Sequence, residues 1–226
     1  MTARLAIFDC DGTLSDGQAA VCNAMVAAFA TQALPAPDLH LVRRMVGLSL
    51  PQAMRHLAPD QSSETQGQLV EAYKQAFRAA RADGSLHEPL FPGMADLVRA
   101  LHADGWALAV ATGKSDRGLA STLAVNGLAE LFSSLQTADR HPSKPDPSML
   151  EACLAETLVE PELAVVIGDT IYDMEMAQAG GVAALGVAWG YHEPDELLAA
   201  GARAVARDAS ELLRLLQEMS HGQQAT

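Results

Sequence analysis

The chain has 226 residues, a formal net charge of −13, 49% apolar residues and 4% aromatic residues. This length fits one large domain or one domain with a modest insert, and a composition rich in Ala and Leu favours a helix-rich protein over an all-β one. The acidic surface argues against nucleic acid and anionic membranes as partners, so any phosphate site must reverse the local field with a metal, a lysine or backbone N–H groups.

The first predicted element is a strand over the short apolar run Leu5–Phe8, which stops at Asp9. Short uninterrupted apolar runs are typical of strands that are buried on both faces of a parallel sheet. From 17 to 90 the pattern changes to helical spacing, and no strand is predicted there. The expected helices follow an amphipathic stretch from Ala20 to Phe29 and then cover Leu39–Val46, Pro51–Leu57 and Glu64–Ala82.

Beyond this insert, predicted strands and helices alternate. Apolar runs that predict strands lie at Ala107–Ala111, Leu163–Ile167 and Ala183–Val187. Helical stretches are expected at Met94–His102, Pro147–Leu158 and Ser210–Met219. Such alternation predicts βαβ units and a doubly wound, Rossmann-like parallel sheet of the α/β class. We therefore expect a core domain made of 1–16 and 91–226, with a small all-helical cap domain at 17–90 inserted after the first strand.

Two acidic residues follow the first predicted strand. Ligands of a doubly wound sheet bind outside the carboxyl ends of its strands, which is where Asp9 and Asp11 are expected. Two neighbouring carboxylates repel each other, and a divalent cation beside them removes that conflict. One carboxylate could then attack phosphorus while the other exchanges a proton with the leaving oxygen and with water. Either aspartate could instead only cap a turn.

Polar residues also follow the later predicted strands. The Thr112 hydroxyl and the Gly113 amide could donate hydrogen bonds to phosphoryl oxygens. Lys144 lies between prolines and could stabilise charge on a phosphoryl group, although a lone lysine could equally be a surface residue. Asp169 and Asp173 offer a small number of oxygen ligands, which suits Mg²⁺, and Asp173 could also be the N-cap of the next helix.

Four motifs in this order resemble those of the haloacid dehalogenase superfamily over the whole chain: Asp9-Cys10-Asp11-Gly12-Thr13-Leu14, Thr112-Gly113, Lys144-Pro145 and Gly168-Asp169-x-x-x-Asp173. The helical insert and Phe91-Pro92-Gly93 are similar to the small cap and the return hinge of its phosphoglycolate phosphatase-like subgroup.

This resemblance implies roles for the motif residues. Asp9 would be the nucleophile and a metal ligand, and Asp11 the general acid/base, with its backbone carbonyl binding Mg²⁺. Thr112 and the Gly113 amide would hold the phosphoryl group, and Lys144 would balance charge near Asp9. Asp169 would bind the metal directly, and Asp173 directly or through water.

The resemblance also implies an activity: Mg²⁺-dependent hydrolysis of a small phosphomonoester through an aspartyl-phosphate, with phosphoglycolate as the leading named substrate. A phosphosugar mutase, an inorganic pyrophosphatase and a non-catalytic binding protein remain open alternatives. Dehalogenation is not expected, because the dehalogenases lack the second aspartate of the first motif. Phosphonate-cleaving relatives use a cap lysine, and we do not assign that role to Lys74, the one lysine of the insert.

Outside the motifs, three further segments attract attention. A cap would read the rest of the substrate, and Arg44 is our candidate for a bidentate contact with a substrate carboxylate, although Arg43 and Arg44 could both be exposed helix charges. Cys10 should face the core, because side chains alternate along an extended chain. Trp189-Gly190-Tyr191 could line the pocket mouth or pack in the core.

The cysteines and the amino-terminal sequence indicate a location. Cys10, Cys22 and Cys153 are odd in number and widely spaced, which suggests neither a disulfide framework nor a zinc site. The start of the chain has no long apolar run, so we expect no signal peptide, and no segment approaches the roughly 20 apolar residues of a membrane span. We therefore expect a cytoplasmic monomer or homodimer that acts on a small phosphorylated metabolite.

Overall fold

The computed structural model describes residues 4–222. Six strands of the described chain form one parallel sheet in the order β3-β2-β1-β4-β5-β6, with β1 and β4 at its centre. The strands are β1 Leu5–Phe8, β2 Ala107–Thr112, β3 Ser134–Thr137, β4 Ala164–Gly168, β5 Ala183–Val187 and β6 Val205–Ala206. This order and direction confirm the predicted doubly wound α/β core.

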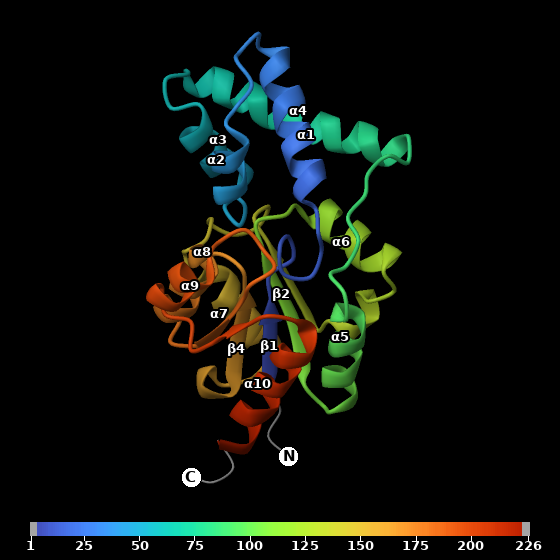
Figure 1. Ribbon diagram of the computed structural model, residues 1–226, viewed down its shortest axis with the longest axis vertical. Coiled ribbons are helices and arrows are strands. Elements are labelled where there is room, and N and C mark those ends of the chain that lie inside the picture. The colour runs from blue at the N-terminus through green and yellow to red at the C-terminus, as the bar shows by residue number, and fades with distance from the viewer. Residues whose placement is uncertain (1–3, 223–226) are drawn as a thin grey trace.

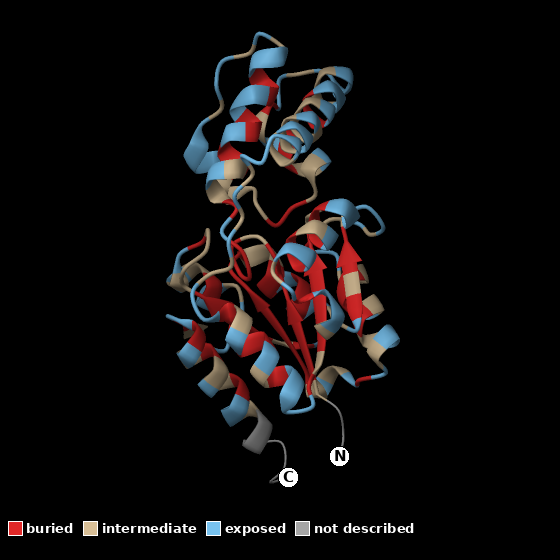
Figure 2. Ribbon diagram, turned by 90° about the vertical axis from the view of Figure 1, so that its right-hand side faces the viewer, coloured by how far each residue is buried: buried red, intermediate tan, exposed pale blue. Residues whose placement is uncertain are grey.

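Helices cover both faces of the sheet. They are α1 Gln18–Thr31, α2 Leu39–Arg44, α3 Leu50–Leu57, α4 Ser63–Ala82, α5 Met94–Ala103, α6 Asp116–Val125, α7 Ser148–Thr157, α8 Ile171–Ala179, α9 Pro194–Ala199 and α10 Ala209–Gly222, with short 3₁₀ helices at Ala129–Leu131 and Pro161–Leu163. Side chains alternate along β1, so Ala6 and Phe8 pack in one apolar layer with α5, α6 and α10. Leu5 and Ile7 pack in the opposite layer with α7, α8 and α9. Figure 2 shows the buried strands between these helices, whose outer faces are exposed.

The helices α1 to α4 pack on one another and not on the sheet. Their apolar cluster is drawn entirely from residues 21–77 and includes Met25, Met54 and Leu69. Figure 1 shows the four helices together at one end of the molecule, beyond the sheet. This grouping supports a cap at 17–90 on a core of 1–16 and 91–226, and we keep these bounds as a proposal.

Two linkers join the cap to the core, and they run side by side. The Asp16 amide donates to the Pro89 carbonyl at 2.8 Å, and the Phe91 amide donates to the Leu14 carbonyl at 3.0 Å. Both linkers therefore leave the core at one place, close to Asp9 and Asp11. Such paired linkers suit a hinge about which a cap can open and close.

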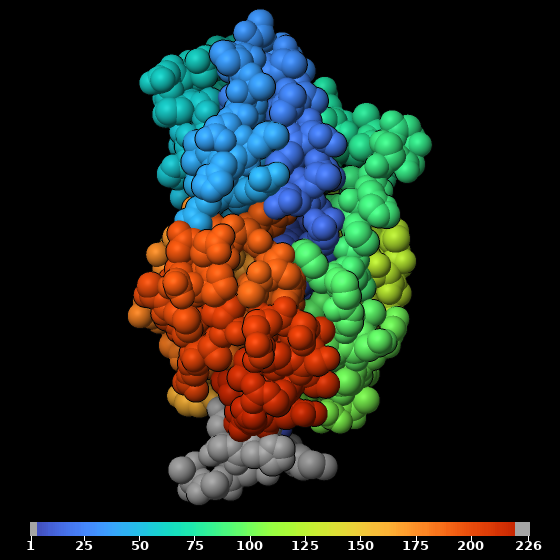
Figure 3. Space-filling view, in the orientation of Figure 1, coloured from blue at the N-terminus to red at the C-terminus, as the bar shows by residue number. Residues whose placement is uncertain are grey.

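The cap is closed onto the core through the segment 44–49, which joins α2 to α3. The Ser49 amide donates to Ser143 Oγ at 2.7 Å, and the Tyr172 hydroxyl donates to the Arg44 carbonyl at 3.3 Å. Figure 3 shows this segment, in light blue, in contact with the orange part of the core that contains α8 and α9. The closed cap separates the carboxyl ends of the strands from bulk water.

No helix of the described chain is both long enough and apolar enough to cross a bilayer. Cys10, Cys22 and Cys153 are all buried and free of disulfides. Cys10 packs in the same apolar layer as Phe8, as expected for a residue that faces the core. Burial is the main cause that raises the pKa of its thiol to about 12, which makes this cysteine chemically inert at neutral pH.

Candidate active site

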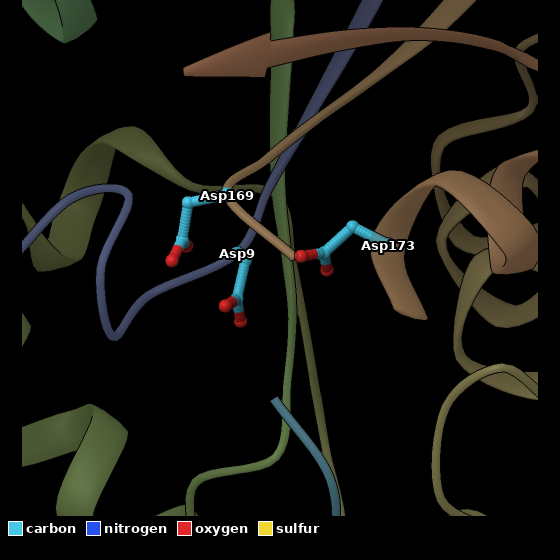
Figure 4. Close-up of side chains that lie close together, drawn as sticks. All are labelled: Asp9, Asp169 and Asp173. Atoms are coloured by element: carbon cyan, nitrogen blue, oxygen red, sulfur yellow. The ribbon is translucent and has the colours of Figure 1, made fainter. Parts of the chain in front are cut away.

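Three buried carboxylates meet at the carboxyl ends of β1 and β4. Asp9 follows β1, Asp169 follows β4, and Asp173 lies in the first turn of α8; each is at most 2% exposed. One carboxylate oxygen of each residue lies within 4.8 Å of the other two. Figure 4 shows the three side chains gathered around one point. The pairing of β1 with β4 brings Asp9 and Asp169 together, because Phe8 lies opposite Ile167 in the register.

Lys144 is fully buried beside this cluster. Its Nζ lies 2.5 Å from Asp173 Oδ1 and 2.9 Å from Asp9 Oδ1. Burial alone would lower the pKa of the ammonium, but the Asp173 and Asp9 carboxylates outweigh that effect and the pKa is raised. The alternative that Lys144 is a surface residue is therefore wrong, and a fixed positive charge lies within the acidic cluster.

Protein donors hold two of the three carboxylates. Asp169 accepts hydrogen bonds from Thr13 Oγ1 at 2.7 Å and from the Tyr191 amide at 2.9 Å. Asp173 Oδ2 accepts from the amide and the hydroxyl of Thr170 at 3.1 and 2.7 Å. Thr170 is the N-cap of α8 and forms a capping box with Asp173, so Asp173 is not the N-cap itself.

Asp9 differs from the other two because its carboxylate has no hydrogen-bond donor. Within residues 4–222, neither of its carboxylate oxygens accepts from an amide or a hydroxyl, and the charged contact at Oδ1 is the ion pair with Lys144 Nζ at 2.9 Å. Burial is the main cause that raises its pKa to about 6; Asp173 and Asp11 add to the rise, and Lys144 opposes it. A buried carboxylate without donors costs folding energy, so these two oxygens are available to a ligand or a reactant.

Gly12 allows the loop after β1 to wrap closely around Asp169. Its φ is 92°, in the left-handed region that glycine adopts without strain. A Cβ at this position would lie 2.2 Å from Asp169 Oδ2. Position 12 therefore requires glycine for two local reasons: the positive φ of the turn and the close approach of the Asp169 side chain.

Asp11 points to a different partner from the cluster. Lys114 Nζ donates to Asp11 Oδ1 at 2.6 Å and to Glu88 Oε1 at 2.7 Å. The Asp11 and Asp173 carboxylates therefore contact different lysines, Lys114 and Lys144. Glu88 belongs to the return linker of the cap, so Lys114 connects the hinge to the side chain expected to move protons.

A cavity of about 420 Å³ lies between the cap and the core. Asp9, Asp11, Thr112 and Gly113 all line it. Thr112 is the last residue of β2, which pairs with β1 on the side opposite β4. The structure thus brings the expected nucleophile, the expected acid/base and the expected phosphoryl donors to one cavity, with Lys144 buried behind Asp9.

Gly113 also lies directly under the closed cap. A Cβ at this position would lie 2.6 Å from the Leu48 carbonyl oxygen and 2.8 Å from the Gly47 carbonyl oxygen. We expect Gly113→Ala to push the cap away and to lower kcat/KM for a phosphate ester by roughly 10- to 100-fold, because the cap then no longer closes over the reacting groups. Steady-state kinetics measures this loss.

Gly67→Ala is the matched control for this prediction. Gly67 lies within α4, and a Cβ there has no atom within 4 Å. We expect this variant to keep wild-type kinetics and to gain helix stability, since alanine is the better helix former. Equal kcat/KM in the two variants would contradict the closing role of Gly113.

Arg44 does not line the cavity, which corrects its expected contact with substrate. Its guanidinium lies 2.5 Å from Glu196 of α9, and His192 Nε2 lies 3.2 Å from its carbonyl oxygen. The physical reason is that α2 packs its C-terminal end on the core, so the side chain meets an acidic helix first. Arg44 therefore joins the cap to the core in the closed state.

Four residues of this site carry contacts that the sequence reasoning missed. Thr13 and the Tyr191 amide hold Asp169, and Lys114 links Asp11 to Glu88. Thr13 lies within the first motif and Lys114 directly follows Thr112-Gly113, so their polar side chains were a usable signal. Tyr191 was singled out only for the pocket mouth or the core, and Glu88 had no signal, because only the tertiary structure brings it to the site.

Comparisons with known proteins found a family model, curated proteins and solved structures that are similar to this chain. Residues 6–187 match the model of the family described as "Haloacid dehalogenase-like hydrolase". The "Probable phosphatase IndB" of Dickeya dadantii is 33% identical over 215 residues, which are 92% of this chain and 91% of that protein. "Phosphoglycolate phosphatase 1" of Pseudomonas aeruginosa is 30% identical over 84% of this chain and 71% of its own length. The crystal structure of a hydrolase from Pseudomonas syringae superposes with a TM-score of 0.84 at 25% identity, over 95% of this chain and 98% of that one.

Proposed function

Because this chain belongs to the haloacid dehalogenase-like hydrolase family and has relatives named as phosphatases, we propose that it is a Mg²⁺-dependent phosphatase that hydrolyses a small phosphomonoester through an aspartyl-phosphate on Asp9. One observation carries this proposal. Asp9 is the one member of the acidic cluster whose carboxylate oxygens are buried and have no hydrogen-bond donor among the described residues.

Asp9 is the nucleophile in this proposal. One of its free oxygens attacks phosphorus, the bond from phosphorus to the leaving oxygen breaks, and an acyl phosphate forms. Lys144, 2.9 Å away, keeps the carboxylate oriented and adds positive charge beside the incoming phosphoryl group. The Thr112 hydroxyl and the Gly113 amide donate to the phosphoryl oxygens from the neighbouring strand end.

Asp11 moves the protons. It gives a proton to the leaving oxygen in the first step and accepts one from the water that hydrolyses the acyl phosphate in the second. In the closed structure Lys114 Nζ lies 2.6 Å from its Oδ1, so this contact must loosen before Asp11 can reach the leaving oxygen.

The acidic cluster fits a magnesium ion. Its ligand atoms are hard oxygens from Asp9, Asp169 and Asp173, and Asp9 Oδ2 has no partner among the described residues. When bound, Mg²⁺ supplies the positive charge that offsets the repulsion between these carboxylates and shields an incoming phosphate from them. Asp173 already binds Lys144 and Thr170, so we assign it a contact through water, and we assign direct contacts to Asp9 and Asp169.

Magnesium should stabilise the fold measurably. At a concentration 100-fold above its Kd, we expect a gain of about 2.7 kcal/mol and a rise in Tm of roughly 5–10 °C, because the ion binds the folded chain and not the unfolded one. A thermal melt with Mg²⁺ and with excess chelator measures the shift. The control is Asp169→Asn, which loses one carboxylate of the cluster and should lose most of the shift; an equal shift in both proteins would place the ion elsewhere.

The substrate screen tests the activity itself. We expect turnover of p-nitrophenyl phosphate with Mg²⁺ and none with chelator, and a ranking of phosphometabolites by kcat/KM, with phosphoglycolate in the panel. Dependence on a bisphosphate activator would favour a mutase, and preference for pyrophosphate would favour a pyrophosphatase. No turnover of any phosphate ester would favour a binding protein and would sink the proposal.

The same reasoning supports the expected setting. We propose a cytoplasmic enzyme, monomeric or homodimeric, whose partner is a small phosphorylated metabolite. Opening of the cap about its paired linkers would admit substrate and release product, and closure would keep water away from the first step.

A further inference from the structure

Positive charge gathers in the cavity of this acidic protein. The chain has 15 Lys and Arg residues and a net charge of −13. Five of these cations line the cavity between the cap and the core: Lys74, Arg78, Arg81, Lys114 and Arg117. Lys114 is already committed to Asp11 and Glu88. The other four lie where a substrate would place the part that does not react.

Helix α4 supplies three of them on one face. Lys74, Arg78 and Arg81 follow one another at intervals of four and three residues, so they form a row about 10 Å long down the helix. Arg117 comes from α6, on the core side of the same cavity. The row therefore borders the cavity from the cap, with Lys74 and Arg81 partly buried and Arg78 exposed, and an exposed cation of the core borders it from the other side.

The arginines of this group have no carboxylate partner. Several arginines outside the cavity pair with acidic residues, as Arg44 does with Glu196 and Arg207 with Glu211, although within residues 4–222 Arg43, Arg55 and Arg203 do not. In the described part of the chain, Arg78, Arg81 and Arg117 form no ion pair. The Nε of Arg81 is also buried without a hydrogen-bond partner. A buried guanidinium N–H without an acceptor is costly, so an anion is the ligand that this position lacks.

Apolar residues cover the wall between the acidic cluster and this basic row. Met25, Met45, Leu48 and Phe77 line the cavity, and the rings of Tyr73 and Phe77 lie 5.0 Å apart. The cavity volume of about 420 Å³ falls within the roughly 300–1,000 Å³ typical of sites for drug-sized ligands. A two-carbon phosphate ester would leave most of that space and all of the apolar wall unused.

We propose that the site is built for a phosphomonoester with a second anionic group at its far end, joined to the ester by an apolar body. The reacting phosphate lies at Asp9, the apolar body lies along the wall, and the distal oxyanion binds Arg81 with its neighbours Arg78 and Arg117. A carboxylate and a phosphate share the geometry that a guanidinium binds with two parallel hydrogen bonds. The proposal rests on the proposed phosphatase function and defines the substrate class of that site.

Four probes test the proposal: phosphoglycolate, hexyl phosphate, and the counterparts of hexyl phosphate with a terminal carboxylate or a second terminal phosphate. We expect kcat/KM for at least one of the two counterparts with an anionic end to exceed that for hexyl phosphate by roughly 10- to 100-fold. This is the factor typical of a hydrogen bond to a charged group. Which of the two ranks higher identifies the distal group. Equal kcat/KM for hexyl phosphate and both counterparts would overturn the proposal.

Arg81→Gln assigns the preference to its residue. We expect the ratio of kcat/KM between the preferred long anionic ester and hexyl phosphate to fall by about 10-fold or more. Arg55→Gln is the control, because Arg55 is an exposed cap arginine outside the cavity that contacts Gln52, and it should keep the wild-type ratio. If Arg81→Gln lowers both esters by the same factor, its role is structural and the assignment is wrong.

Failure of the phosphatase function gives a different result from failure of this proposal. If the wild-type protein hydrolyses none of the esters, the activity is refuted, and calorimetric binding of the corresponding non-hydrolysable phosphonates decides the binding question. Tighter binding of the long phosphonate with an anionic end than of hexylphosphonate supports the basic subsite. Equal binding of the two phosphonates by the wild-type protein refutes it. Binding of the long anionic phosphonate that is as tight in the Arg81→Gln variant as in the wild type refutes it as well.

Discussion

Replacing Asp9 by Asn should lower the turnover of p-nitrophenyl phosphate by at least about 10³-fold while leaving the fold intact. The reason is local. The Asp9 oxygens accept from no amide or hydroxyl of the described chain, so the substitution removes the attacking group and weakens only the contact with Lys144, which keeps Asp173 as its partner. It also removes one negative charge from a cluster in which Asp169 and Asp173 remain, so the thermal stability without metal should not fall.

The matched variant is Asp11→Asn, which should fail at a different step. p-Nitrophenolate leaves without needing a proton, so Asp9 should still be phosphorylated, whereas water is no longer activated to remove the phosphoryl group. Mass spectrometry after acid quench should therefore find phosphate on the peptide that contains Asp9 in Asp11→Asn and none in Asp9→Asn. Turnover by Asp9→Asn near the wild-type rate would refute the nucleophile.

The central strands could be predicted from the sequence because each is an uninterrupted apolar run. β1, β2, β4 and β5 lie inside the sheet and are buried on both faces, so periodicity was not needed to find them. The edge strands β3 and β6 were missed. β3 contains Ser134, Gln136 and Thr137, which are buried yet polar. Gln136 Nε2 donates a hydrogen bond to Ser134 Oγ at 2.8 Å. A strand of this composition has no apolar signal.

The core helices α6 and α9 were also missed, and α8 was expected only as the helix that begins near Asp173, without bounds. α8 buries Met174, Met176 and Ala177, with acidic and amide residues interspersed, and shows no clear polar face. The cap helices were found because their apolar spacing is regular, as for Met54 in α3 and for Leu69 and Val70 in α4. Helical periodicity thus identified α3 and α4, whereas α8 has no regular apolar stripe; α6 does bury Leu119 and Leu123 on one side and was overlooked.

For the site, the sequence predicted the members better than their contacts. Motif order placed Asp9, Thr112 and Asp169 at strand ends, and the sheet brings them together there. It could not show that Lys144 is buried between Asp9 and Asp173, or that Lys114 binds Asp11. Arg44 illustrates the same limit, because its partner Glu196 comes from a helix 152 positions away in the chain.

Replacing Lys144 by Met should destabilise the metal-free protein by roughly 3–5 kcal/mol and abolish turnover. Lys144 is the fully buried cation between Asp9 and Asp173, so its loss leaves mutually repelling carboxylates without a counter-charge. Urea unfolding with excess chelator measures the loss. Lys74→Met is the control for stability alone, since Lys74 is a partly exposed lysine at the cavity rim that pairs with Glu71, and its effect on stability should stay within about 0.5 kcal/mol.

A double variant separates charge from packing, and it remains informative if Lys144→Met barely folds. Asp173→Asn removes the carboxylate that lies 2.5 Å from Lys144 Nζ, so in the Lys144→Met background it should restore part of the lost stability. The coupling free energy between the two positions should then be on the order of 1–3 kcal/mol. If the two losses of stability simply add, Lys144 acts through packing alone. If its charge is essential, magnesium should also partly restore the stability of Lys144→Met, because the ion supplies positive charge to the same carboxylates.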